Sequence, residues 1–253
     1  MILTDSIHKA AKDLVHARNV VALTGAGISV ESGIPPFRGK GGLWEKFDPM
    51  EYAHIDAFMK NPAKVWDVLI KEMKGIMDNA RPNDAHNGLA GLEKLGILKT
   101  IITQNVDGLH QMAGNTDVIE FHGNFAWQRC MECNNRCETR KIDIEQIPPR
   151  CECGGIYKPE CIFFGEMIPP QCLQRSQIAA STCDTMLVIG TSAGVQPAAS
   201  IPIIAKQAGA KIIEINLERT PLSKTISDYI IMGNAGEVLK TLTIEIERLL
   251  ANK

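Results

Sequence analysis

The chain lacks any apolar run long enough to cross a bilayer. Its longest apolar stretches, such as Thr185 to Ile189, fall far short of the roughly 20 residues that a membrane-spanning helix needs. The N-terminus MILTDSIHKAAKDL also lacks the basic start and the hydrophobic core of a secretory signal. We therefore expect a cytoplasmic protein that has no membrane partner.

An excess of basic charge is also missing. Lys and Arg number 27 against 29 Asp and Glu, and the formal net charge is −2. Binding to nucleic acid depends on clustered Lys and Arg that release counterions from phosphates, whereas both signs are interspersed here. The sequence therefore argues against a direct nucleic-acid partner, and it sets no oligomeric state. Its 253 residues suffice for one large domain with a smaller satellite.

Short apolar runs alternate with helical patterns along most of the chain. Runs of strand length, rich in β-branched residues, cover residues 20–23, 100–102, 118–121, 186–189 and 211–215. Helical patterns cover residues 4–17, 85–95, 170–180, 198–207 and 236–250. Strands that are apolar on both faces and alternate with helices predict an α/β fold, with a parallel sheet covered on both sides.

Two segments interrupt this alternation. Residues 40–82 have a helical, Met-rich pattern, and residues 126–159 are polar and rich in cysteine. We expect both to be insertions that together form a smaller lobe. The predicted domains are a discontinuous sheet domain, residues 1–39, 83–125 and 160–253, and a small domain, residues 40–82 and 126–159.

A glycine-rich loop, GAGISVESGIPPFRG at residues 25–39, follows the first predicted strand. Its start resembles the dinucleotide-binding fingerprint, in which missing side chains let backbone N–H groups approach a pyrophosphate. The third glycine of that fingerprint is absent, since Val30 stands there, and no acidic residue in a strand lies about 20 positions further on. Taken alone, the loop leaves two interpretations open, a dinucleotide site and a structural turn.

Polar residues follow four of the other predicted strands. Because the carboxyl ends of parallel strands meet at one edge of a sheet, we expect these residues to line one cleft. His122 stands at a strand end before a glycine, where its ring can face a ligand, and a purely structural histidine is the alternative. The polar segments are Thr103 to Asp107, His122-Gly123, Gly190 to Ser192 and Asn216 to Glu218.

Eight cysteines in a reducing compartment are expected to hold metal or to remain free thiols. Cys130-x-x-Cys133 and Cys151-x-Cys153 flank a polar loop, a spacing typical of a zinc ribbon. Four thiolates leave no open position for water, so we expect this zinc to be structural. Because the second pair is unusually close, Cys137 is an alternative ligand. The remaining cysteines, Cys161, Cys172 and Cys183, are predicted to be buried thiols.

Together these motifs resemble the sirtuin family of NAD-dependent protein deacylases. They occur in the family's order and span nearly the whole chain. The resemblance implies a Rossmann-like domain, a small lobe made of a zinc ribbon and a helical module, and a cleft for NAD and an acyl-lysine peptide. The motifs are GAGIS at 25–29, SGIP at 32–35, Phe37-Arg38, TQNVD at 103–107, His122-Gly123, the paired cysteines, FGE at 164–166, GTS at 190–192 and Asn216-x-Glu218.

The resemblance also implies roles for individual residues. His122 and Asn105 would be catalytic, and Arg38 would supply positive charge to the phosphates of NAD. The peptide and its acyl-lysine would contact Ile162, Phe163, Phe164, Gly165, Glu166, Gly194 and Val195. The cofactor-binding residues would be Gly25, Ala26, Gly27, Ser29, Ile34, Phe37, Arg38, Thr103, Gln104, Asn105, Val106, Asp107, Gly190, Thr191, Ser192, Asn216, Leu217, Glu218 and Ala235.

The implied reaction is acyl transfer to ADP-ribose with acetylated proteins or peptides as partners. The acetyl oxygen would attack the ribose carbon that bears nicotinamide, and His122 would then act as the general base. The products would be free lysine, nicotinamide and O-acetyl-ADP-ribose. Family members that prefer succinyl groups carry a Tyr and an Arg in the helical module, where this chain has Leu69 and Glu72. We therefore expect acetyl to be preferred over succinyl.

Three other functions remain as alternatives. A protein mono-ADP-ribosyltransferase would use the same NAD site, and the apolar residues 162–164 speak for deacetylation instead. A hydride-transferring dehydrogenase fits less well, because the acidic ribose-binding residue is missing at its expected spacing. A catalytically silent NAD-binding module fits poorly with Asn105, Asp107 and His122 all present.

Overall fold

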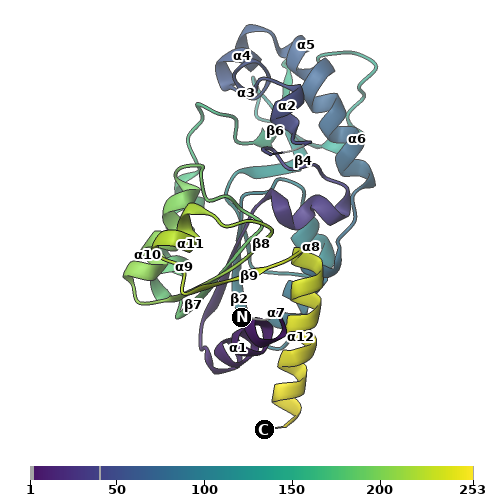
Figure 1. Cartoon of the computed structure of the whole chain (residues 1–253). Coiled ribbons are helices and arrows are strands. Elements are labelled where there is room, and N and C mark those ends of the chain that lie inside the picture. The colour runs from purple at the N-terminus through teal and green to yellow at the C-terminus, as the bar shows by residue number, and fades with distance from the viewer. Residues whose placement is uncertain (1–2, 40, 253) are drawn as a thin grey trace.

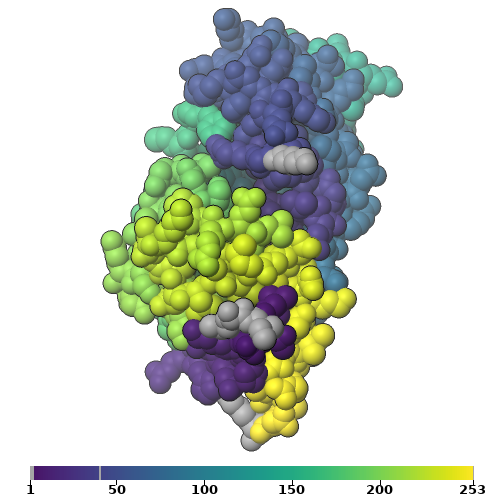
Figure 2. All heavy atoms as spheres, viewed as in Figure 1, coloured from purple at the N-terminus to yellow at the C-terminus, as the bar shows by residue number. Residues whose placement is uncertain are grey.

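The computed structural model describes residues 3–39 and 41–252, so that Lys40, at the predicted start of the small domain, lies outside the described residues. Two lobes are stacked one above the other (Figure 1). The lower lobe contains the large sheet and both ends of the chain, and the upper lobe contains α2–α6 and a second sheet. The space-filling view shows the two lobes in contact, with the C-terminal helix along the lower one (Figure 2).

The large sheet is six-stranded and entirely parallel. Numbered within this sheet, its order is 3-2-1-4-5-6, the Rossmann arrangement, and the order reverses between β1 and β7. The five predicted strands are confirmed, whereas the four-residue edge strand β9 was not predicted. In spatial order the strands are β3 (Val118–Glu120), β2 (Leu98–Thr103), β1 (Val20–Thr24), β7 (Thr185–Ile189), β8 (Lys211–Asn216) and β9 (Tyr229–Met232).

Helices cover both faces of this sheet. One face packs against α1 (Leu3–His16), α7 (Asp84–Lys94) and α12 (Ala235–Ala251), and the other against α9 (Pro170–Thr182) and α10 (Ile201–Gln207). Every residue of β1 and β7 is buried, which explains why each strand is apolar except for one threonine. The five predicted helices are confirmed, although 198–200 forms a 3-10 turn, η4 (Ala198–Ser200).

The small lobe has one core made from two separate stretches of the chain. Its helical stretch and an antiparallel sheet of order β5-β4-β6 share a hydrophobic cluster centred on Trp66 and Phe58. The indole N–H of Trp66 donates to the carbonyl of Tyr157 at 2.8 Å. The elements are α2 (Leu43–Lys46), α3 (Pro49–Tyr52), α4 (Ile55–Lys60), α5 (Pro62–Val65), the π-helical η2 (Trp66–Ile70), α6 (Lys71–Asn79), β4 (Gly123–Cys130), β5 (Arg136–Glu138), η3 (Thr139–Lys141) and β6 (Tyr157–Cys161).

This architecture confirms the predicted fold class, a Rossmann-like sheet with a smaller inserted lobe. The domain boundaries stay a prediction, since β4 and β6 extend slightly into the segments assigned to the sheet domain. In the part of the chain that the structure describes, no helix combines the length and the apolar character that crossing a membrane requires.

Candidate active site

The glycine-rich loop lies at the point where the strand order reverses. It leaves β1 and winds into a short 3-10 helix, η1 (Ala26–Ser32). The N–H of Gly25 donates to the carbonyl of Ile189, and the N–H of Gly27 donates to that of Gly190. A Cβ on Gly27 would lie 2.7 Å from the Gly190 Cα, so only glycine permits this approach. The loops after β1 and β7 therefore form one surface at the topological switch point, where ligands bind in such folds.

Asn105 is fixed at the end of β2 with one polar atom left over. Its Nδ2 donates to the Gly25 carbonyl at 3.2 Å and to Ser29 Oγ at 3.0 Å, and its backbone N–H donates to Thr103 Oγ1. Ser29 Oγ in turn donates to Asp107 Oδ2 at 2.7 Å. Asn105 is buried, yet its Oδ1 has no partner. An unpaired buried oxygen of this kind fits an N–H or O–H group of a ligand.

His122 is presented as a neutral base. Its Nδ1 lies 3.1 Å from the Gln104 carbonyl oxygen, which can only accept, so Nδ1 carries the proton and Nε2 keeps its lone pair. Burial lowers the pKa of His122, and the hydrogen bond to Gln104 opposes this shift in part. The ring packs edge-on against Phe121. At neutral pH the imidazole is therefore uncharged and able to take a proton.

The polar ends of two further strands, β7 and β8, are joined to the end of β2 beside these residues. Gln104 Nε2 donates to Thr191 Oγ1 at 2.9 Å, and Asn216 Nδ2 donates to the Thr191 carbonyl at 3.0 Å. The structure thus brings the ends of β2, β7 and β8 together, as the sequence predicted. Of the other predicted cofactor residues, Ile34 is buried, Phe37 and Val106 are partly exposed, and Arg38, Ser192, Leu217 and Glu218 are exposed.

Two buried histidines lie beneath the glycine-rich loop, and the sequence analysis did not find them. The rings of His86 in α7 and His110 in α8 (Leu109–Ala113) are 5.0 Å apart. His110 Nε2 lies 3.0 Å from Thr24 Oγ1, and His86 Nε2 lies 3.5 Å from Ser29 Oγ. Burial lowers the pKa of His86 to about 4, and burial together with His86 lowers that of His110 to about 3. Both imidazoles are therefore neutral supports of the site.

The start of α12 closes the other side of the glycine-rich loop. Ala235, a predicted cofactor contact, is the first residue of this helix and is buried. The N–H of Gly236 donates to Glu31 Oε2 at 2.8 Å. From the other side, Asn83 Nδ2 donates to the Ile28 carbonyl at 2.8 Å. The η1 helix is thus held by the N-termini of two helices.

The predicted peptide-binding segment, residues 162–166, is hydrogen-bonded to the helical stretch of the small lobe. The backbone N–H of Phe164 donates to the Ala53 carbonyl, and the N–H of Ile55 donates to the Phe164 carbonyl, both at 2.9 Å. Phe163 is buried in the small-lobe core against Phe58, whereas Ile162 and Phe164 remain partly exposed. Of the three aromatic or aliphatic residues predicted to contact acyl-lysine, two are therefore accessible.

The carboxylate of Glu166 interacts with other residues of the protein. Its carboxylate lies 2.8 Å from Nζ of the buried Lys158 and accepts the Phe163 N–H at 2.7 Å. Its own backbone N–H donates to the Phe163 carbonyl. These contacts fix the turn through Gly165, where a Cβ would lie 2.8 Å from His54. Gly194 and Val195, the other predicted peptide contacts, lie in the loop after β7.

An aromatic chain connects the glycine-rich loop with this segment. Phe37 stacks on Trp44 with ring centroids 5.4 Å apart, and Trp44 lies 6.3 Å from Phe164. The sequence analysis placed Trp44 in the helical module but gave it no role in the site. Its contact with Phe37 lies within one short stretch of chain, where the Trp44 N–H donates to the Phe37 carbonyl at 3.0 Å, whereas its contact with Phe164 joins segments far apart in the sequence.

The paired cysteines converge in the small lobe. The sulfur atoms of Cys130, Cys133, Cys151 and Cys153 all lie within 4.8 Å of one another. The Cys130–Cys153 and Cys133–Cys151 sulfur distances are 3.5 and 3.7 Å, close to the ~3.8 Å edge of a tetrahedron with Zn–S bonds of ~2.3 Å. This donor set fits a structural zinc ion. Cys137 is not in the group, which settles the alternative ligand against it.

Comparison with known proteins assigns the family. The model of the Sir2 family matches residues 25–197, which run from the glycine-rich loop past the end of β7. The chain therefore belongs to the Sir2, or sirtuin, family.

Its relatives cover nearly the whole chain. An Archaeoglobus fulgidus protein named NAD-dependent protein deacylase 1 is 47% identical over 96% of this chain and 99% of its own length. The crystal structure of a Sir2 homologue in complex with NAD superimposes with a TM-score of 0.88 at 47% identity, over 96% of this chain and 94% of the other. A Sir2 variant with a deacetylated p53 peptide and 3′-O-acetyl ADP-ribose gives a TM-score of 0.88 at 33% identity, over 94% and 98%.

Proposed function

We propose that the protein removes acetyl groups from lysine side chains of proteins with NAD as cosubstrate. One observation carries this proposal. Among the polar strand ends, His122 offers its Nε2 as a free base and Asn105 offers an unpaired Oδ1 nearby. The His122 ring hydrogen-bonds to the Gln104 carbonyl, directly before Asn105, so both groups face the same edge of the sheet. The relatives named as NAD-dependent deacylases support this conclusion.

In this proposal NAD lies across the switch point. The backbone of residues 25–29 and the Arg38 guanidinium take the diphosphate, because a bare backbone and a fixed positive charge both favour phosphate oxygens. Gln104, Thr191, Ser192 and the segment 216–218 hold the ribose and adenine end, with Ala235 closing it. Ile34, Asn105, Val106 and Asp107 form the nicotinamide pocket, where the Asn105 Oδ1 accepts from the ligand.

The chemistry then needs little from the protein besides position and one base. The acetyl oxygen forms a bond to the ribose carbon as the bond to nicotinamide breaks, and nicotinamide leaves with the bonding electron pair as a neutral molecule. His122 Nε2 takes the proton of a ribose hydroxyl, and that oxygen attacks the former acetyl carbon. Water completes the release of lysine, and the acetyl group stays on ADP-ribose. A neutral imidazole is suited to this step near pH 7.

The acyl-lysine lies against apolar residues beside His122 in this proposal. Ile162, whose N–H donates to the His122 carbonyl at 2.8 Å, and Phe164 flank its methylenes. Leu69 is buried and Glu72 lies 3.4 Å from Lys46 Nζ, so the helical module offers no free cation at these two positions for a succinyl carboxylate. We propose acetyl as the preferred group for this reason.

The test uses NAD with and without an acetyl-lysine peptide, followed by mass spectrometry of peptide and nucleotide products. We expect peptide-dependent release of nicotinamide together with O-acetyl-ADP-ribose, and loss of both in His122→Ala. The control is His16→Gln, which alters an exposed histidine at the end of α1. Nicotinamide release without peptide, with ADP-ribose fixed to protein, would identify a mono-ADP-ribosyltransferase instead. Normal turnover in His122→Ala would remove the assigned base.

A further inference from the structure

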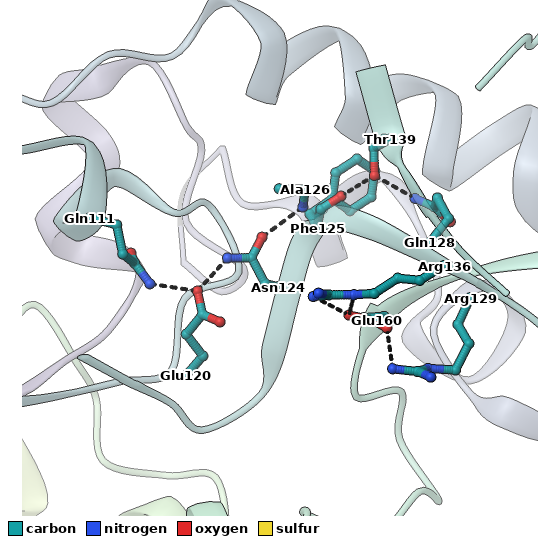
Figure 3. Close-up of polar contacts among 10 residues, drawn as sticks. All are labelled: Gln111, Glu120, Asn124, Phe125, Ala126, Gln128, Arg129, Arg136, Thr139 and Glu160. Atoms are coloured by element: carbon teal, nitrogen blue, oxygen red, sulfur yellow. Dashed lines mark hydrogen bonds and ion pairs between the residues drawn. The ribbon is translucent and has the colours of Figure 1, made fainter. Parts of the chain in front are cut away.

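Glu120 ties together three elements around the turn that carries His122. It is the last residue of β3, two positions before His122. Its carboxylate accepts a hydrogen bond from Gln111 Nε2 of α8 at 2.7 Å and another from Asn124 Nδ2 of β4. Figure 3 shows both amides pointing at the same carboxylate oxygen. One side chain therefore connects the sheet, a helix and the first strand of the small lobe.

The Glu120–Asn124 hydrogen bond closes the base of the His122 turn. The two residues flank Phe121, His122 and Gly123, so their side chains bridge the turn from one end to the other. On its far side Asn124 Oδ1 accepts the Ala126 N–H at 2.7 Å (Figure 3). Gly123 has a φ of +77°, and a Cβ there would lie 1.9 Å from the Glu160 carbonyl oxygen. The backbone of the turn is thus confined to one path.

The surroundings of the Glu120 carboxylate offer little net stabilisation of the fold, so stability alone does not explain an acid at this position. Glu120 is half-buried, and its two hydrogen-bond donors are neutral amides rather than cations. Burial raises its pKa, and the Asn124 and Gln111 hydrogen bonds together with the charge of Arg136 oppose that shift only in part. The neighbouring arginines serve another acid, because Arg129 and Arg136 each form an ion pair with Glu160 (Figure 3). Glu120 therefore accepts hydrogen bonds from neutral amides only and feels the charge of Arg136 without forming an ion pair with it, so no direct ion pair offsets its desolvation cost.

We propose that Glu120 is a positioning residue for His122, holding its turn so that Nε2 is aimed into the site. The proposal rests on the proposed deacetylase reaction, in which His122 is the base. Glu120 acts through the turn and touches neither NAD nor the peptide. Its removal should therefore slow the chemical step and leave NAD binding intact, because misplacement of a catalytic group by ~1 Å costs up to about a hundredfold in rate.

The matched control is Glu93, a second half-buried carboxylate that holds an amide. Its Oε2 accepts from Asn115 Nδ2 at 2.6 Å and its Oε1 from the Thr116 N–H at 3.0 Å, away from the His122 turn. Glu120→Ala and Glu93→Ala each remove an acid that binds neutral donors. Glu120→Gln keeps an acceptor oxygen at position 120 and should restore the turn.

The experiment compares kcat with an acetyl-lysine peptide, the KM for NAD and the melting temperature of the three variants with the unchanged protein. We expect Glu120→Ala to lower kcat between about tenfold and a hundredfold, with the KM for NAD within about twofold. Glu120→Gln should recover most of kcat, and Glu93→Ala should lower the melting temperature without a selective loss of kcat. Equal effects of Glu120→Ala and Glu93→Ala on kcat, or a parallel loss of NAD affinity, would overturn the proposal.

A second readout separates this inference from the proposed function. The Cε1–H resonance of His122 in a proton NMR titration reports the surroundings of the ring without any turnover. Glu120→Ala should shift or broaden it, and Glu93→Ala should leave it unchanged. If the unchanged protein releases no nicotinamide with acetyl-peptide, the proposed function fails, yet the NMR result still decides the role of Glu120. An unchanged His122 resonance in Glu120→Ala would refute that role directly.

Discussion

Glu31 and Gly236 lie 205 positions apart in the sequence, and the Gly236 N–H donates to the Glu31 carboxylate at 2.8 Å. Gly236 is in the first turn of α12, where the Asn234 side chain makes no cap. Glu31 therefore satisfies an N–H that helices usually pair with a neighbouring residue. The bond ties the glycine-rich loop to the helix that ends the chain.

Loss of this bond should destabilise the protein by about 1 kcal/mol in Glu31→Ala, the usual cost of losing a helix N-cap. The control is Glu237→Ala, which removes an exposed acid from the same first turn of α12. Urea unfolding measures both. In a Gly236→Ala background, whose Cβ displaces the carboxylate, removal of Glu31 should cost little more. Equal losses in Glu31→Ala and Glu237→Ala would contradict the specific role of the bond.

The pH dependence of kcat/KM should show an acid limb below 6.5, the ordinary pKa of histidine. Burial lowers the pKa of His122, so the free base persists to more acidic pH than an exposed imidazole would allow. The measurement is kcat/KM for the acetyl-peptide at saturating NAD between pH 5 and 8. The variant His8→Gln, which alters a histidine of α1 beside Glu245 of α12, should leave this limb in place. An acid limb with its midpoint above pH 6.5 would contradict the lowered pKa that burial gives His122.

Acidification should destabilise the fold through the buried pair His86 and His110. Both have folded pKa values, about 4 and about 3, below the ordinary 6.5. Between pH 6.5 and these values the unfolded chain binds protons that the folded chain refuses, so the free energy of unfolding falls as the pH falls. The shift of His86 alone corresponds to roughly 3 kcal/mol. Urea unfolding at a series of pH values from 7.5 to 4.5 gives the free energy of unfolding at each pH. This free energy should fall less steeply with decreasing pH in His110→Gln, and as steeply as in the unchanged protein in His16→Gln.

Removal of zinc should unfold the small lobe selectively. Cys130→Ala takes away a buried ligand, whereas Cys137→Ala alters a cysteine outside the group of four. We expect one zinc per chain by native mass spectrometry in the unchanged protein and in Cys137→Ala, and loss of zinc with a large drop in stability in Cys130→Ala. Full stability of Cys130→Ala without metal would contradict a structural role for zinc.

The parts of the fold that the sequence predicts are those written in local patterns. The apolar runs of β1 and β7 indicate buried strands, whereas the glycines of the first loop required the neighbouring motifs before a dinucleotide site could be chosen over a structural turn. The edge strand β9 lacked that signal, since only one of its four residues is buried. The paired cysteines were predictable because two tight pairs suffice to build a tetrahedron, and only coordinates could exclude Cys137.

The parts of the site that the sequence did not predict depend on contacts between distant segments. His86 and His110 lie on different helices, and the contact between their rings forms only when both helices pack beneath the loop. Trp44 contacts Phe164 from a segment far away in the sequence, and both rings pack on the core of the small lobe. Glu120 appeared as an ordinary strand residue, and its amide partners come from α8 and β4.

The small-lobe core also bears on the order in which the chain can fold. Its last strand ends at Cys161, whereas β1 stays without one of its two neighbours until β7, which begins at Thr185, has been made. During synthesis the small lobe can therefore assemble first, while β1 still has one edge without a hydrogen-bonded neighbour. Long-range pairing of that kind slows folding, and an unpaired apolar strand invites association with other chains. A nascent chain of this protein is most vulnerable to aggregation in the interval between those two strands.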